Sequence, residues 1–124
     1  MDALTALFVL TLLMVKHTVA DYGLQSAYQL TQKGSYGAPG GLLHAAIHGA
    51  LTLLVILWFC NMKVAVLLAC VDALVHYHID YVKVKVTNHF NMQPNQTRYW
   101  VAFGSDQLAH YLTYAAITAG IAVS

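Results

Sequence analysis

The stretch His44-Ala45-Ala46-Ile47-His48 places two imidazoles one helical turn apart inside an otherwise apolar segment. Residues four apart share one face of a helix, so this pair offers two metal donors on a single stripe. Three other apolar segments carry a pair at the same spacing: His17 with Asp21, His76 with Asp80, and Asp106 with His110. Four such pairs in 124 residues indicate helices arranged around a shared polar centre.

The composition is typical of an integral membrane protein. Hydrophobic residues make up 59% of the chain and charged residues 9%, whereas a soluble domain has roughly 25% charged residues. Six basic residues stand against five acidic ones, and they form no basic patch of the kind that binds nucleic acid. The length fits a single domain over residues 1–124. The expected partner is the lipid bilayer, and self-association into an oligomer stays open.

Four segments are expected to form helices that cross the bilayer. Crossing takes about 20 residues, so the short apolar run from Ala3 to Val15 must continue as a helix through His17 and Asp21. The loop at 34–41, rich in Gly and containing Pro, then ends that helix. We predict an all-α fold, an integral membrane four-helix bundle with up-down-up-down topology and helices at about 3–30, 42–60, 64–84 and 99–122.

The positions of the four pairs agree with this topology. The pairs of the first and third helices come late in their helices, and those of the second and fourth come early. In an alternating bundle these ends lie on the same side of the membrane, so all four pairs fall at one depth. Ionisable residues at a membrane helix centre cost about 2.5–3.5 kcal/mol each. We therefore expect them to face the bundle interior, paired with one another or bound to metal.

Imidazole and carboxylate are ligands of divalent transition metals, and helical bundles commonly build such sites from facing helices. Neither Cys60 nor Cys70 lies on the polar stripes, which excludes a cysteine-type zinc site and favours a nitrogen and oxygen shell with an open water position. We predict zinc before iron or manganese, as one ion or two. The candidate ligands are His17, Asp21, His44, His48, His76, Asp80, Asp106 and His110; with one ion, some aspartates would instead orient histidines.

Other polar residues near the stripes have alternative roles. Any single His/Asp pair is more simply an interhelical hydrogen bond than a metal site. Asp72, one turn before His76, is either such a bond or part of a proton relay. Gln25 and Gln107 are expected to orient ligands or to bridge helices.

The loop charges predict an orientation. Lys33, Lys83, Lys85 and Arg98 flank the loops on the side of the polar pairs, while only Lys63 lies on the opposite side. The positive-inside rule then places both termini outside and the polar centre in the cytoplasmic leaflet of a bacterial inner membrane.

Four segments also carry a family resemblance: HTVADYGLQ at 17–25, LHAAIHGALT at 43–52, HYHIDYVK at 76–83 and DQLAH at 106–110. Together they resemble the signature segments of the domain-of-unknown-function family 3307, small membrane proteins of bacteria and their phages. The resemblance covers nearly the whole chain apart from the two long loops, and it implies no particular activity. More loosely, the pattern is similar to inner-membrane proteins labelled metal-dependent hydrolases. Lys16 departs from the expected apolar residue, and a cation there could snorkel to the interface or bind a phosphate.

The functional hypothesis is a membrane-embedded metal-dependent hydrolase. A zinc-like ion lowers the pKa of its bound water toward about 7, and the hydroxide would attack an ester or phosphoester of a lipid or lipid-linked substrate at the cytoplasmic leaflet. Whichever of Asp21, Asp80 and Asp106 is not a ligand would act as the general base. One alternative is a metal-ion transporter or sensor, which needs a polar route across the bilayer. The other is a non-enzymatic phage or host interaction protein in which a metal stabilises the fold.

Overall fold

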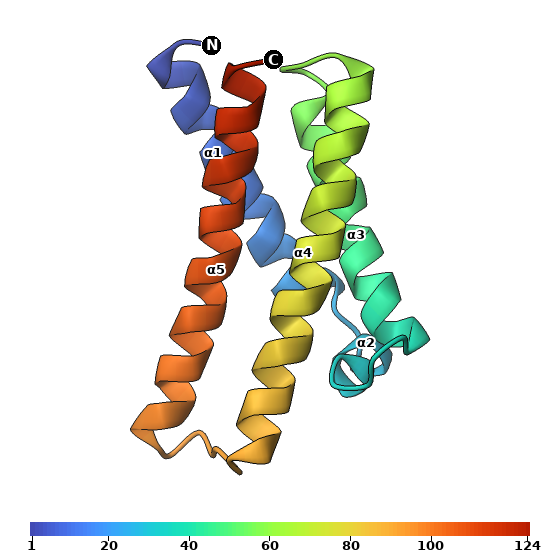
Figure 1. Ribbon diagram of the computed structural model, residues 1–124, viewed down its shortest axis with the longest axis vertical. Helices are drawn as coiled ribbons and strands as arrows, with labels where there is room; N and C mark the ends of the chain where they lie inside the picture. The colour runs from blue at the N-terminus through green and yellow to red at the C-terminus, as the bar shows by residue number, and fades with distance from the viewer.

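The computed structural model describes residues 1–124 and consists of helices joined by short connections, without strands (Figure 1). The all-α prediction is therefore confirmed. The prediction of four helices is wrong, because the expected first helix is divided and five α-helices are present. In chain order the elements are α1 (Ala3–Thr18), the π-helical segment η1 (Val19–Leu24), α2 (Ala27–Gln32), α3 (Pro39–Ile56), α4 (Met62–His89) and α5 (Thr97–Ala122).

The helix expected over residues 3–30 breaks just after η1. Gln25 and Ser26 have extended backbone, and the Ser26 hydroxyl accepts a hydrogen bond from the Gln29 amide at 3.4 Å. A serine in this position satisfies one of the free N–H groups at the start of a helix. Gly23 and Ser26 are weak helix formers and are the only local signal of the break. As a result, α2 starts in a new direction and packs against α3.

The ends of the other helices follow from local sequence. Pro39 stands in the first turn of α3, where a missing N–H costs nothing. The Asn61 side chain accepts from the Val64 amide at 3.1 Å and caps α4. α4 extends to His89, five residues beyond the expected end at 84, and α5 begins at Thr97.

The four long helices alternate in direction. In Figure 1 both termini lie at one end, α1 and α4 run away from that end, and α3 and α5 run back toward it. α3 packs against α1, α2 and α4, and α5 packs against α1 and α4. This arrangement brings the late parts of α1 and α4 to the same level as the early parts of α3 and α5.

Three helical segments are long and apolar enough to cross a membrane: Ala3–Leu24, Pro39–Ile56 and Met62–His89. The chain is thus a helical membrane protein. α5 has 26 residues but is not among the three, since Asp106, Gln107 and His110 make it more polar. It nevertheless presents Val101, Leu108 and Leu112 outward, each 57–62% exposed. Its role as a fourth membrane span stays a prediction.

The bundle is apolar inside at the end that carries the termini. The core there consists of Val9, Leu13, Ile56, Ala65, Tyr114, Ile117 and Ile121. Along the seam between α3 and α4, Gly49 allows a close approach of the two backbones. A Cβ atom at Gly49 would lie 2.9 Å from Ala73 Cβ and 3.1 Å from the Ala69 carbonyl oxygen. Small residues commonly permit such contacts between membrane helices.

Substitution of Gly49→Ala should destabilise the bundle by about 1–3 kcal/mol, because the added methyl group forces α3 and α4 apart. Gly104→Ala is the matched control, since a Cβ there meets nothing within 4 Å. Thermal unfolding in detergent should show a lower Tm for Gly49→Ala and an unchanged or higher Tm for Gly104→Ala. Equal Tm values for the two variants would contradict the close packing.

Candidate metal centre

The structure gathers all eight predicted site residues into one cluster, which we call the His–Asp cluster: His17, Asp21, His44, His48, His76, Asp80, Asp106 and His110. The five histidines are each at most 1% exposed, and Asp80 and Asp106 are buried as well. The Asp21 side chain is 15% exposed. The predicted convergence of residues from four separate helices is therefore present in the structure.

The Nε2 atoms of the histidines point toward the carboxylates at the centre of the cluster. Asp21 lies within 3.1–3.2 Å of Nε2 of His17, His44 and His48. Asp80 lies 3.3 Å from Nε2 of His44, His76 and His110. His44 Nε2 and His76 Nε2 are themselves 3.1 Å apart. Asp21 and Asp80 are thus each surrounded by three imidazoles.

With neutral imidazoles, hydrogen bonds alone do not satisfy this arrangement. His44 donates its Nδ1 proton to Gln29 Oε1 at 3.1 Å, so a neutral His44 has only a lone pair on Nε2. That lone pair faces Asp21 Oδ1, Asp80 Oδ2 and His76 Nε2, all within 3.3 Å. Lone pairs and carboxylates at this distance repel one another unless a proton or a cation lies between them.

The charge of the surroundings also calls for a cation. Asp21, Asp72, Asp80 and Asp106 bring four negative charges into the bundle, and the buried Lys16 and Lys33 bring two positive ones. Two negative charges remain in a setting where unpaired charge is costly. One divalent ion, or two additional protons on histidines, would balance them.

The spacing of the donor atoms fits a transition metal. Ligands 2.0–2.1 Å from a tetrahedral zinc ion are about 3.3–3.4 Å from one another, and the contacts above span 3.1–3.3 Å. Two sets without a common residue each bring their donor atoms within 4.8 Å: Asp21 with His44, His48 and His76, and Asp80 with Asp106 and His110. A third set, His17 with His76 and His110, connects them. The buried His–Asp cluster could therefore hold one ion or two.

The outer nitrogens of His17, His44 and His48 contact residues that can orient the rings, whereas His76 Nδ1 is buried without a hydrogen-bond partner. His17 Nδ1 lies 2.7 Å from the Tyr114 hydroxyl, and His48 Nδ1 lies 3.5 Å from Lys16 Nζ. Partners of this kind fix ring orientation in metal sites. Gln107 lies beside the cluster as expected: its Oε1 atom is 3.3 Å from His17 Nε2, and its amide group donates to Asp106 Oδ2 at 3.1 Å, which can orient that carboxylate. Gln25 instead donates to the Asp21 carbonyl of the preceding segment η1.

Two residues at the cluster were not predicted, Gln29 and Lys33. Gln29 contacts His44, and the buried Lys33 amine lies 2.7 Å from Asp80 Oδ2. Both continue the four-residue spacing that starts at Asp21, and this spacing is the sequence feature from which they could have been predicted. Because Lys33 is paired inside the protein, it is not a free loop cation. The predicted orientation in the membrane then rests on three loop cations on the side of the polar pairs, Lys83, Lys85 and Arg98, compared with one on the opposite side, Lys63.

Lys16 and Asp72 form a buried ion pair on the side of the His–Asp cluster nearer the termini. Their charged atoms are 2.8 Å apart, and the Thr52 hydroxyl donates to the same carboxylate oxygen at 2.5 Å. The expectation that Lys16 snorkels to the interface or binds a phosphate is therefore wrong, because Asp72 already neutralises it inside the bundle. Of the two readings of Asp72, the structure shows the interhelical one.

A comparison with protein families supports the resemblance drawn from the four sequence segments. The model described as "Protein of unknown function (DUF3307)" matches residues 9–124, a range that includes the whole His–Asp cluster. The chain belongs to the DUF3307 family. Among curated proteins and among solved structures, no match was found. The looser similarity to metal-dependent hydrolases is not supported by these comparisons and stays a hypothesis from the sequence.

In this DUF3307 protein, His76→Ala should lower bound metal more than about tenfold, because His76 belongs to two of the three donor sets. His78→Ala is the matched control. His78 lies two residues away but contacts Tyr36 and the Leu74 carbonyl instead of the cluster. Inductively coupled plasma mass spectrometry on the purified variants measures the difference. Equal metal content in the two variants would contradict a role for His76.

The buried ion pair predicts a second mutational pattern. Asp72→Leu alone should destabilise the protein by about 3–5 kcal/mol, because it leaves the Lys16 ammonium unpaired inside the bundle. The double variant Lys16→Met with Asp72→Leu should recover most of this loss. Thermal unfolding in detergent tests the pattern, and a double variant no more stable than Asp72→Leu would argue against it.

Proposed function

We propose that this protein is a membrane-embedded metal-dependent hydrolase acting on an ester or phosphoester of a lipid or lipid-linked substrate, at the cytoplasmic leaflet of a bacterial inner membrane. The observation that carries the proposal is a set of five imidazoles and three carboxylates gathered inside the bundle, with donor atoms close enough to one another to share a metal ion. Zinc is the proposed metal. When bound, such an ion polarises the substrate and lowers the pKa of a bound water toward about 7.

The contacts divide the carboxylates into two roles. Asp21 and Asp80 each approach three imidazoles, as expected of metal ligands or of carboxylates between two ions. Among the imidazoles, Asp106 approaches only His110, at 3.6 Å, and its buried Oδ1 atom has no hydrogen-bond partner. A carboxylate next to a metal set, with a free oxygen, is suited to act as a general base.

In this proposal Asp106 handles the proton of the reaction. Hydrolysis joins the oxygen of one water to the phosphorus or acyl carbon and breaks the bond to the alcohol. Asp106 accepts one proton from that water and returns it to the departing alkoxide. The histidines and the other two aspartates hold the metal, while Gln107 keeps the Asp106 carboxylate in place through its 3.1 Å hydrogen bond.

Transport of metal ions is the less favoured function. A transporter needs a polar route through the whole bilayer, but beyond Lys16 and Asp72 the bundle is filled by the apolar core around Leu13, Ile56 and Ile117. A polar centre closed on that side is better suited to a reaction that starts and ends in one leaflet.

Asp106→Asn should reduce hydrolysis by about 10²- to 10⁴-fold, the usual contribution of a general base, while bound metal stays close to the wild-type level. The assay supplies zinc-loaded protein with mixed phospholipid vesicles and follows ³¹P NMR signals together with released fatty acids. Absence of hydrolysis with zinc, iron and manganese alike would contradict the proposed hydrolase. An undiminished rate in Asp106→Asn would contradict the role of Asp106 as general base. Zinc uptake into proteoliposomes would favour the transporter instead.

A further inference from the structure

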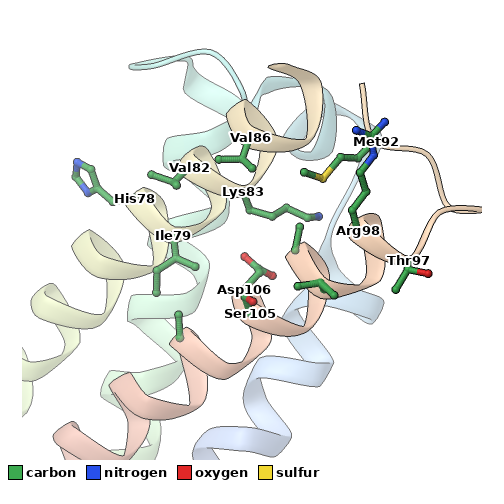
Figure 2. A pocket seen from close by; sticks show the side chains of 13 residues that line it. His78, Ile79, Val82, Lys83, Val86, Met92, Thr97, Arg98, Ser105 and Asp106 are labelled. Carbon is green, nitrogen blue, oxygen red and sulfur yellow. The ribbon is translucent and has the colours of Figure 1, made fainter. Parts of the chain in front are cut away.

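A groove of about 850 Å³ lies between α4 and α5, near the loop that joins them (Figure 2). Its walls are mostly apolar, with Ile79, Val82 and Val86 on α4 and Val101 and Ala102 on α5. Val82, Val86 and Val101 are exposed. In a membrane these walls face hydrocarbon chains, so the groove is open sideways to lipid.

Two cations line this groove, and neither has an acidic partner. Figure 2 shows the Lys83 side chain extending from α4 across the groove, with Arg98 on the opposite wall. Lys83 Nζ lies 5.5 Å from the centre of the Phe103 ring, and Arg98 Nε donates to Gln96 Oε1 at 2.8 Å. Their positive charges are thus available to an anion that enters the groove.

The groove and the His–Asp cluster share one residue, Asp106. The Asp106 side chain is only 5% exposed, and its Oδ1 atom is buried without a hydrogen-bond partner. In Figure 2 the Asp106 carboxylate points into the groove below Lys83. A molecule in the groove would therefore meet the cluster at Asp106.

We propose that the groove binds one anionic phospholipid, with its phosphate between Lys83 and Arg98 and an acyl chain along the apolar walls. Two cations without acidic partners favour a phospholipid whose headgroup carries a net negative charge, and the apolar walls favour its hydrocarbon chain. A free phosphate offers only the first of these. The bound lipid would be the substrate, reaching Asp106 from the side of the bundle, and this part of the proposal rests on the proposed function. Lipid binding by itself requires no metal.

Native mass spectrometry of the full-length protein, released from mixed micelles without added metal, tests the binding. The probes are phosphatidylglycerol and phosphatidylcholine at equal concentration, which differ in net charge. The wild type should retain phosphatidylglycerol at least about tenfold better, and the double variant Lys83→Gln with Arg98→Gln should lose this preference. Lys85→Gln is the matched control, because Lys85 lies over the Tyr81 ring and does not line the groove.

A second variant tests the apolar part of the groove. Ala102→Phe places a ring in the groove and should reduce retention of both lipids by severalfold while the Tm in detergent stays near that of the wild type. Equal retention of both lipids by the wild type would overturn the proposal, as would an equal loss of preference in Lys85→Gln or displacement by millimolar inorganic phosphate alone.

The same samples separate failure of the groove from failure of the proposed function. The double variant should keep its bound metal, since neither cation contacts the His–Asp cluster. If the wild type binds the anionic lipid selectively but hydrolyses no lipid, the proposed function is wrong and the proposed lipid site is supported. If the protein hydrolyses lipid but shows no preference for binding the anionic lipid, the proposed lipid site is wrong and the proposed function is supported.

Discussion

Burial of charge inside a membrane bundle is the constraint on which the rest of this structure depends. Four carboxylates and five imidazoles lie within the protein, and only Lys16 and Lys33 are there to offset the negative charge. Each unpaired charge would cost several kcal/mol in this setting. The fold is stable only if these groups satisfy one another or share a cation, which requires all four long helices to present them at one depth.

Two features of the helices allow these groups to meet: the break before α2 and the buried pair of Lys16 and Asp72. The break at Gln25 and Ser26 turns α2 against α3, so that Gln29 reaches His44 and Lys33 reaches Asp80. A straight helix through residue 30 would carry both side chains past the cluster. On the opposite side, the Lys16 and Asp72 pair marks the limit between the polar centre and the apolar core. The cluster is therefore closed toward the termini and borders a lipid-facing groove only at Asp106.

Much of this arrangement follows from sequence because helix spacing and alternating topology are simple geometric rules. Pairs such as His44 and His48 could be placed on one face, and their position within each helix gave the shared depth. The same rules could not predict the pairing of Lys16 with Asp72, since periodicity assigns a face but does not identify the partner across the bundle. The break before α2 was missed because it depends on the cap at Ser26 and on contacts with α3. The groove between α4 and α5 could not be predicted because it depends on how the two helices pack, which neither sequence segment specifies alone.

X-ray absorption spectroscopy on protein purified without chelators tests the central claim, a metal held by imidazole and carboxylate inside the bundle. At the edge of the bound metal, with zinc examined first and then iron and manganese, we expect a shell of nitrogen and oxygen neighbours at about 2.0–2.2 Å with outer scattering from imidazole rings. A metal signal at background level, or a sulfur shell near about 2.3 Å, would contradict the claim.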